Sequence, residues 1–280
     1  MSAADVVLGA VSAAAGSARL VEAVDTVGIL GVRVSAVDMD RAVECIERWI
    51  ATGERNYVCV TGAHGVIESR NDARLREIHN AAGLAVPDGM PIVFMANRLG
   101  HPNVRRVYGP DLMRRLTAIS AVRGYRQYYY GGGPGLAERL ADTLRARHPG
   151  LVVAGTLSPP FRSLTQSEDE AIVNEIRAAK PDIVWVGLST PKQEYWMSRQ
   201  LDRLDGPVLI GVGAAFDFLA GTKRQAPQWM QRAGLEWLYR LASEPRRLWR
   251  RYAVVVPTFA SLGLLQIVGH KLRSLRDRAE

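Results

Sequence analysis

The sequence has 280 residues, a formal net charge of +8 and 48% hydrophobic residues. This length and hydrophobic content predict a globular chain with one large domain or two small ones. The positive charge indicates an anionic partner, which leaves nucleic acid, anionic lipid and a phosphorylated substrate open. The two cysteines, Cys45 and Cys59, lie among apolar residues. They are therefore expected to be buried free thiols in a reducing cytosol.

Residues 1–26 are expected to form a flexible leader. The segment is apolar, but it has an early Asp5 and no Lys or Arg before Arg19. It therefore lacks the charged start of a secretory signal.

From residue 27 to residue 224, short β-branched runs alternate with amphipathic helical stretches. This alternation predicts an α/β domain with a mainly parallel sheet and helices on both faces. The expected strands are Ile29–Val34, Tyr57–Thr61, Leu84–Val86, Gln127–Tyr130, Val152–Thr156, Ile183–Val186 and Val208–Val212. The expected helices are one capped by Asp38 and others at Val66–Asn80, Pro110–Val122, Leu136–Arg147, Glu168–Ala179 and Lys192–Leu201.

Residues 225–280 differ in character and are here called the C-terminal appendage. The pattern is wholly helical and rich in Trp and Arg, with five arginines between Arg240 and Arg251. The next 18 residues, Tyr252–Gly269, carry no charge, and basic residues follow from Lys271. Because a membrane span needs about 20 predominantly apolar residues, we expect this run to lie on or dip into one leaflet of an anionic membrane.

Loops that follow the predicted strands are candidates for a site, because open α/β sheets bind ligands beyond the carboxyl ends of their strands. Asp88 lies in a Pro-Asp-Gly turn after a short strand, where a carboxylate can remove a proton from an attacking hydroxyl. The alternative is that this Asp serves turn geometry alone. His64 comes shortly after the expected strand Tyr57–Thr61, and it either contacts a sugar hydroxyl or caps the next helix.

Phosphate and sugar contacts have candidates too. The glycine run at Gly131 and Gly132 follows a strand and opens a helix, so its N–H groups suit a nucleotide diphosphate, although any tight turn can use such glycines. No acidic residue follows at the end of the next strand, which argues against a nicotinamide dinucleotide. Arg106 suits a bidentate phosphate contact or is merely exposed. Gln193 begins a helix, where its amide binds a sugar or base unless that turn is solvated.

No cysteine and histidine spacing fits a structural zinc site, and no Asp-x-Asp pair lies in a loop. The pair at Asp38 and Asp40 is better interpreted as a helix start. We therefore expect no metal and no cofactor.

Taken together, five segments resemble the WecG/TagA/CpsF family, glycosyltransferase family 26. They occur in the family's order at Ala85–Pro91, Arg106–Leu112, Val186–Glu194, Gly213–Asp217 and Arg224–Arg247. The resemblance covers roughly residues 28–252. It implies a Rossmann-like fold with a membrane-associating helical appendage, and an inverting transfer without metal from a UDP-sugar to an undecaprenyl-diphosphate-linked saccharide.

The resemblance also assigns roles to residues. Asp88 matches the proposed catalytic base, and Arg106 matches a candidate contact to a diphosphate or acceptor. The remaining substrate contacts that it implies are the donor-pocket positions Thr61, Gln193 and Asp217, the nucleotide turn Gly131–Gly132, and the appendage arginines Arg240 and Arg247 for the lipid diphosphate.

One segment departs from the family pattern. Many members have Thr-x-Asn at the loop that follows the strand Tyr57–Thr61, whereas this chain has Thr61-Gly62-Ala63-His64. The departure resembles an exopolysaccharide branch, in which a glucosyl residue is added to a lipid-linked glucose.

Two other classes of function are weighed against this one. A nucleic-acid-binding module explains the basic charge, but predicts charge interleaved with exposed aromatics on one face, whereas here arginine gathers beside an apolar run. A catalytically silent membrane scaffold of a polysaccharide assembly complex would keep the appendage and lose the pocket. The expected location is the cytoplasmic face of the cell membrane, and a homo-oligomer is compatible with the sequence.

Overall fold

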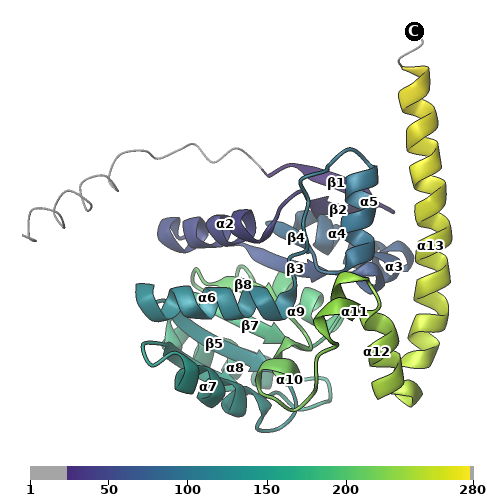
Figure 1. Ribbon diagram of the computed structural model, residues 1–280. Helices are drawn as coiled ribbons and strands as arrows, with labels where there is room; N and C mark the ends of the chain where they lie inside the picture. Colours follow the sequence, from purple (N-terminus) through teal and green to yellow (C-terminus); the bar gives the residue numbers. More distant parts are fainter. Residues whose placement is uncertain (1–23, 278–280) are drawn as a thin grey trace, which may run out of the picture.

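A computed structural model describes residues 24–277 of the chain. Most of the predicted leader therefore lies outside the described residues, and Thr26 already belongs to a strand. The described part consists of an α/β body with three C-terminal helices against one side, of which the last extends past the body (Figure 1).

The described residues form a six-stranded sheet in which every pair of neighbours is parallel, with the order β4-β3-β8-β7-β5-β6. Its strands are β3 (Tyr57–Thr61), β4 (Leu84–Pro87), β5 (Arg126–Gly131), β6 (Val152–Leu157), β7 (Ile183–Gly187) and β8 (Val208–Gly211). The predicted parallel α/β sheet is confirmed, and the carboxyl ends of its strands meet at one edge.

Helices cover both faces of this sheet, as predicted. Alternate strand residues point to opposite faces, so that Tyr129 packs in one core and Tyr128 in the other. The first face is covered by α2 (Met39–Thr52), α6 (Gly109–Arg123), α7 (Leu136–Arg147) and α10 (Ala215–Leu219). The second is covered by α4 (Ala73–Ala81), α8 (Gln166–Ala179) and α9 (Lys192–Gln200). Asp38 caps α2, accepting from the Arg41 N–H over 2.9 Å, and both cysteines are buried and free.

The predicted strand Ile29–Val34 is wrong, because the chain forms an antiparallel hairpin there. Strands β1 (Thr26–Ile29) and β2 (Val32–Ser35) are joined by Leu30 and Gly31, which both have positive φ, at 50° and 94°. Two positive φ values are the geometry of a tight hairpin turn. Apolar residues stand on both sides of Gly31, at Ile29, Leu30 and Val32, which is why the run resembles one strand.

The predicted helix Val66–Asn80 is also wrong in its extent. It consists of α3 (Ala63–Asn71) and α4, which are separated by Asp72 in an extended conformation. The Asp72 carboxylate accepts from the Leu75 N–H over 3.1 Å and so caps α4. A further helix that the sequence analysis missed, α5 (Met90–Arg98), begins directly after Asp88 and Gly89, with Pro91 in its first turn.

The C-terminal appendage contains α11 (Gln228–Arg232), α12 (Glu236–Ser243) and α13 (Pro245–Arg276). Helix α13 packs on the hairpin, α3 and α5 through buried apolar residues, among them Val255, Phe259 and Ile267. Gln266 fixes it further, since its Nε2 donates to the Gly28 carbonyl over 2.6 Å and its Oε1 accepts from the Leu30 N–H over 3.0 Å. Among the described helices, α13 is long and apolar enough to cross a bilayer by length and composition.

Candidate active site

A cavity of 360 Å³ opens at the edge of the sheet where the parallel strands end. Its first wall consists of the loops that follow β3, β4, β7 and β8, which contribute Gly62, His64, Asp88, Ser189, Thr190, Gln193 and Gly213. Its second wall comes from the appendage, which contributes Trp237, Arg240, Arg251, Tyr252, Val255, Val256, Phe259 and Ala260. The cavity therefore lies between the carboxyl end of the sheet and the C-terminal helices.

Asp88 follows β4 and is partly buried in the wall of this cavity. Its backbone N–H donates to the Thr61 carbonyl over 3.0 Å, and its Oδ1 accepts from the Gly109 N–H over 3.0 Å. Desolvation raises the pKa of Asp88 to about 6, and the carboxylate of Glu236 adds to that effect, whereas Arg106 opposes it. A carboxylate with this pKa is ionised at neutral pH and is well matched to taking up a proton.

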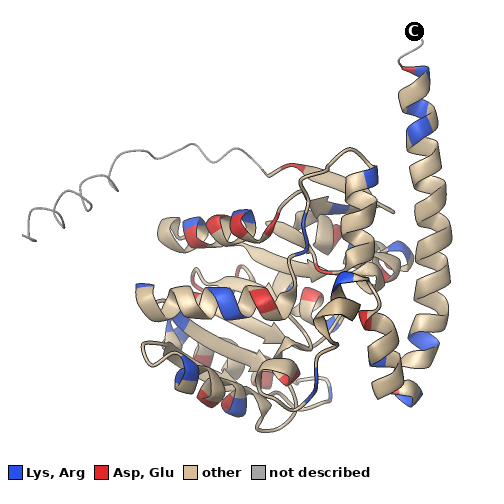
Figure 2. Ribbon diagram, in the orientation of Figure 1, with Lys and Arg blue, Asp and Glu red and all other residues tan. Residues whose placement is uncertain are grey.

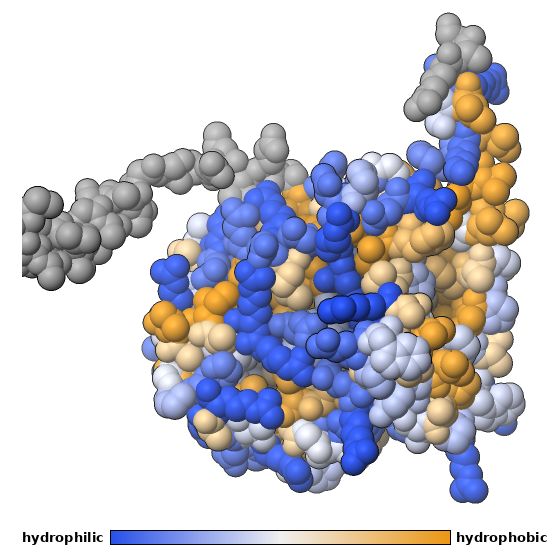
Figure 3. All heavy atoms as spheres, in the orientation of Figure 1, coloured by the Kyte–Doolittle hydropathy of each residue, from blue (hydrophilic) through white to orange (hydrophobic). Residues whose placement is uncertain are grey.

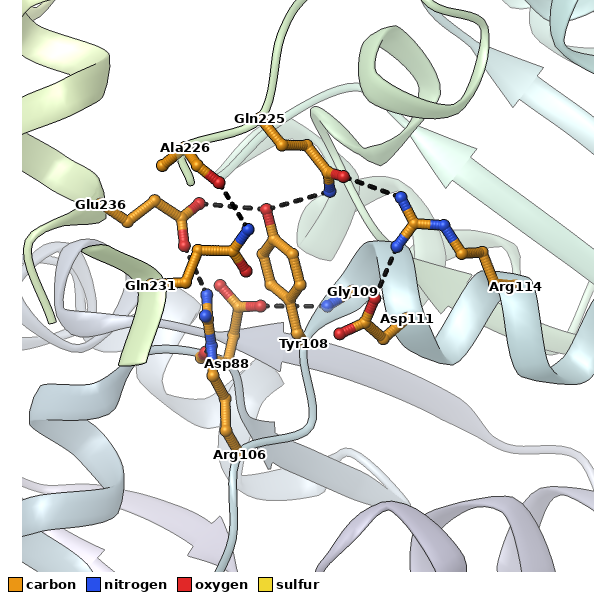
Figure 4. A network of polar contacts seen from close by, with 10 residues as sticks. All are labelled: Asp88, Arg106, Tyr108, Gly109, Asp111, Arg114, Gln225, Ala226, Gln231 and Glu236. Carbon is orange, nitrogen blue, oxygen red and sulfur yellow. Dashed lines mark hydrogen bonds and ion pairs between the residues drawn. The ribbon is translucent and has the colours of Figure 1, made fainter. Parts of the chain in front are cut away.

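Arg106 lies beside Asp88 and joins the body to the appendage (Figure 4). Its Nη2 lies 2.6 Å from a carboxylate oxygen of Glu236 on α12, and each of the two side chains is 17% exposed. Its Nε donates to the backbone carbonyl of Asp88, and its guanidinium lies over the Tyr108 ring, 4.0 Å from the centroid. The Tyr108 hydroxyl donates to the same Glu236 carboxylate over 3.1 Å. The Arg106 guanidinium is thus held by Glu236 of the appendage and by Asp88 and Tyr108 of the body.

His64 lies on the first turn of α3, with its Nε2 3.3 Å from a Glu68 carboxylate oxygen. Desolvation lowers the pKa of His64 to about 4, and the positive charges of Arg251 and Arg240 contribute. The imidazole is therefore neutral at neutral pH. A neutral ring donates to Glu68 when its proton is on Nε2, which leaves Nδ1 free to accept a hydrogen bond.

Gln193 lies on the first turn of α9 and is held by its neighbour. Its Nε2 donates to Oε1 of Glu194 over 3.1 Å, and the Thr190 hydroxyl donates to the same oxygen over 2.8 Å. Both Gln193 and Glu194 are buried. The amide is thereby fixed against the end of β8, where a Cβ at Gly211 would lie 3.1 Å from Nε2.

The structure brings five of the predicted site residues to the cavity: Asp88, His64, Arg106, Gln193 and Arg240. The predicted residues that are not part of its lining are Thr61, Gly131, Gly132, Asp217 and Arg247. Their assigned roles stay predictions.

Local contacts explain these other positions. Gly131 approaches the β7 backbone so closely that a Cβ there would lie 2.6 Å from the carbonyl carbon of Gly187. The Thr61 hydroxyl is buried and donates to the Cys59 carbonyl over 3.2 Å. Asp217 accepts from the Thr222 hydroxyl over 3.2 Å, and Arg247 pairs with Glu244 over 2.6 Å.

Several lining residues were missed by the sequence analysis, chiefly Tyr108, Glu236 and Arg251. Tyr108 and Glu236 lie inside segments that carry the family resemblance, so the resemblance could have indicated them as site residues. Arg251 was counted only as part of a basic tail, because the sequence does not show which side of a helix faces a pocket.

Within residues 24–277, no group of three or more His, Cys, Asp or Glu side chains is placed to hold a metal ion. The expected metal independence stays a prediction.

Comparison with known proteins finds a family and relatives for this chain. Two relatives from Staphylococcus aureus, of strains MW2 and NCTC 8325 / PS 47, are each 29% identical over 233 residues, covering 82% of this chain and 89% of the relative. Both are named N-acetylglucosaminyldiphosphoundecaprenol N-acetyl-beta-D-mannosaminyltransferase. The family model described as Glycosyl transferase WecG/TagA/CpsF family matches residues 27–273, which include every wall of the cavity. The chain is a glycosyltransferase and belongs to the WecG/TagA/CpsF family.

Proposed function

We propose that this protein transfers a sugar, with inversion, from a UDP-sugar to an undecaprenyl-diphosphate-linked saccharide. The observation that carries the proposal is the composition of the cavity, which combines one carboxylate of raised pKa, three arginines and an apolar wall. A sugar diphosphate joined to a lipid is an amphipathic substrate that matches these three features. The relatives are named for a diphosphoundecaprenol-linked acceptor.

The chemistry follows from Asp88. The acceptor hydroxyl attacks the anomeric carbon of the donor, its proton passes to Asp88, and the bond from that carbon to the diphosphate breaks. A single displacement of this kind inverts the configuration at the anomeric carbon. The Gly109 N–H holds Oδ1, and Oδ2 lies beside Gly62, where even an added Cβ would stay 3.8 Å away. Oδ2 is therefore the oxygen with room to take up the proton.

The negative charge that grows on the departing UDP requires cations. Arg240 and Arg251 line the same cavity, and both of their charges act on His64. Preorganised cations of this kind stabilise charge as it develops in a transition state. Arg106 is the third, and its pairing with Glu236 keeps it beside Asp88.

The C-terminal appendage contains the surface that is proposed to contact the membrane, where the lipid-linked acceptor lies. Charged residues occur at both ends of α13 but not between Arg251 and Lys271, as Figure 2 shows. Much of this uncharged stretch is exposed, including Leu264, Leu265 and Val268, and Figure 3 shows apolar surface along α13. An uncharged, exposed apolar helix with basic ends suits the cytoplasmic face of an anionic membrane. On this proposal residues 27–224 bind the donor, and residues 225–280 bring the acceptor.

The donor sugar has two candidates. The relatives are named for N-acetylmannosamine. In this chain Ala63 takes the place of the Asn that many family members have two residues after Thr, and His64 follows it. This departure favours glucose and an exopolysaccharide. A neutral His64 provides an acceptor for a sugar hydroxyl in either case.

The test is transfer of radiolabel from a panel of UDP-sugars to prenyl-diphosphate-linked glucose or N-acetylglucosamine, with EDTA present. One reactive pair would support the proposal and identify both substrates. Activity that returns only with a divalent metal would contradict metal independence. If no pair reacts with EDTA or with added metal although donors bind, the acceptor is another one or the protein is a catalytically silent scaffold.

A further inference from the structure

Helices α5 and α13 both line the cavity. Met90 and Pro91 on α5 line it opposite Val256 and Ala260 on α13. Further along both helices, Met95 meets Gly263, where a Cβ would lie 2.9 Å from the Met95 sulfur. Residue numbers therefore increase in the same direction along both helices, which shows that α5 and α13 run parallel where they touch (Figure 1).

Helical spacing extends the two lining stripes beyond the cavity. On α5 the stripe of Met90 and Pro91 continues at Phe94, and on α13 the stripe of Val256 and Ala260 continues at Leu264, because residues three or four apart share a face. Exposure rises along both stripes: Phe94 is 52% exposed and Leu264 is 62% exposed. The Met95–Gly263 contact lies beneath them. We infer from these stripes an apolar groove from the cavity to the molecular surface, with the Arg98 guanidinium over the Phe94 ring, 4.9 Å from its centroid, at the outer end.

The two ends of this path differ in charge. At the inner end, Arg240 and Arg251 line the same cavity as Asp88 and His64. The charge of Arg240 acts on both of these groups, and the charge of Arg251 acts on His64. From Tyr252 to the outer end, α13 has no charged residue until Lys271. A ligand that fits the whole path has an anionic head and a long uncharged hydrocarbon tail.

We propose that the isoprenoid tail of the acceptor leaves the cavity through the groove between α5 and α13, over Phe94 and Leu264. This inference rests on the proposed function and adds to it a binding site for the tail. The apolar end of the groove continues into the exposed face of α13, so a tail that follows it passes directly from protein to lipid.

The experiment uses the full chain in solution, without vesicles, and two acceptors with the same diphosphate-linked sugar and a tail of one or three isoprene units. Burying extra apolar carbons strengthens binding, so the wild-type KM for the longer acceptor is expected to be about tenfold lower. A double variant, Phe94→Gln with Leu264→Gln, is expected to reduce this ratio toward one. The matched control is Leu265→Gln, an adjacent and equally exposed residue on another face of α13, which should keep the wild-type ratio.

Three results would overturn the inference: no preference for the longer tail in the wild type, an unchanged preference in the double variant, or an equal loss in Leu265→Gln. Each would leave the proposed function intact, provided that the short acceptor is glycosylated. Binding of UDP by the double variant shows that it is folded, and the single variant Leu264→Gln replaces it if it is not. Failure of the wild type to bind any UDP-sugar would instead reject the proposed function, and the inference with it.

Discussion

The guanidinium of Arg106 lies 2.6 Å from the carboxylate of Glu236, 130 residues further along the chain. This pair connects the loop before α6 to the start of α12, beside Asp88. The appendage is therefore tied to the carboxyl end of the sheet by an ion pair as well as by the apolar packing of α13.

Replacing Glu236 by Gln should destabilise the protein by about 1–2 kcal/mol, because it leaves a largely buried guanidinium without its anion. Urea unfolding measures the change. Asp142→Asn is the control, since its pair with Arg145 is exposed and should contribute little. Equal effects of the two changes would mean that the Arg106–Glu236 pair does not hold the appendage.

The pH dependence of kcat/KM should reveal the ionisation of the Asp88 carboxyl group. Because only the ionised carboxylate takes up a proton, and because desolvation raises its pKa to about 6, activity should fall tenfold per pH unit below about pH 6 and level off above it. Glu236 contributes to the raised pKa, so Glu236→Gln should move the falling limb to lower pH. A wild-type profile that stays flat down to pH 5 would argue against Asp88 as the base.

His64 should make the folded state sensitive to acid. Its folded pKa is about 4 against an ordinary value of 6.5, so between these values the unfolded chain binds the proton and the folded protein does not. Stability is therefore lost as pH falls through this window, by about 1–2 kcal/mol at pH 5. His64→Asn should lose less stability than the wild type between pH 7 and pH 5. Identical losses would show that His64 is protonated in the folded protein.

Membrane binding should depend on the exposed face of α13. Substituting Glu for Leu265, Val268 and Leu272, all exposed, should abolish sedimentation with anionic vesicles, because it places charge on the apolar surface. The control substitutes Glu for Val122 and Phe161, which are exposed on the α/β body. Undiminished sedimentation of the α13 variant would contradict the proposed docking face.

The parallel sheet and most of its helices could be predicted from the sequence, because buried strands and helix caps leave local patterns. β3 and α7, for example, have the predicted bounds. The hairpin was missed because Leu30 and Val32, on either side of Gly31, keep the run apolar where the chain reverses. The break at Asp72 was missed because one carboxylate both ends a helix and caps the next.

Strand ends made part of the candidate site predictable, as at Asp88, and the family resemblance added Arg240. The partners that shape its chemistry come from distant segments, and local spacing does not show that Glu236 meets Arg106 or that Arg251 faces His64. The glycines at Gly131 and Gly132 matched a phosphate-binding pattern, but close packing of backbones also requires glycine, and Gly131 lies directly against Gly187. A sequence pattern does not separate these two causes.

The most direct test of the central claim is to compare Asp88→Asn with the wild type, measuring both sugar transfer under single-turnover conditions and the Kd of the donor. Loss of a general base should slow transfer by about 100- to 10,000-fold, while the Kd stays within about threefold, since Asn preserves the shape and the acceptor oxygen for the Gly109 N–H. A variant that transfers sugar at the wild-type rate would contradict the assignment of Asp88 as the base.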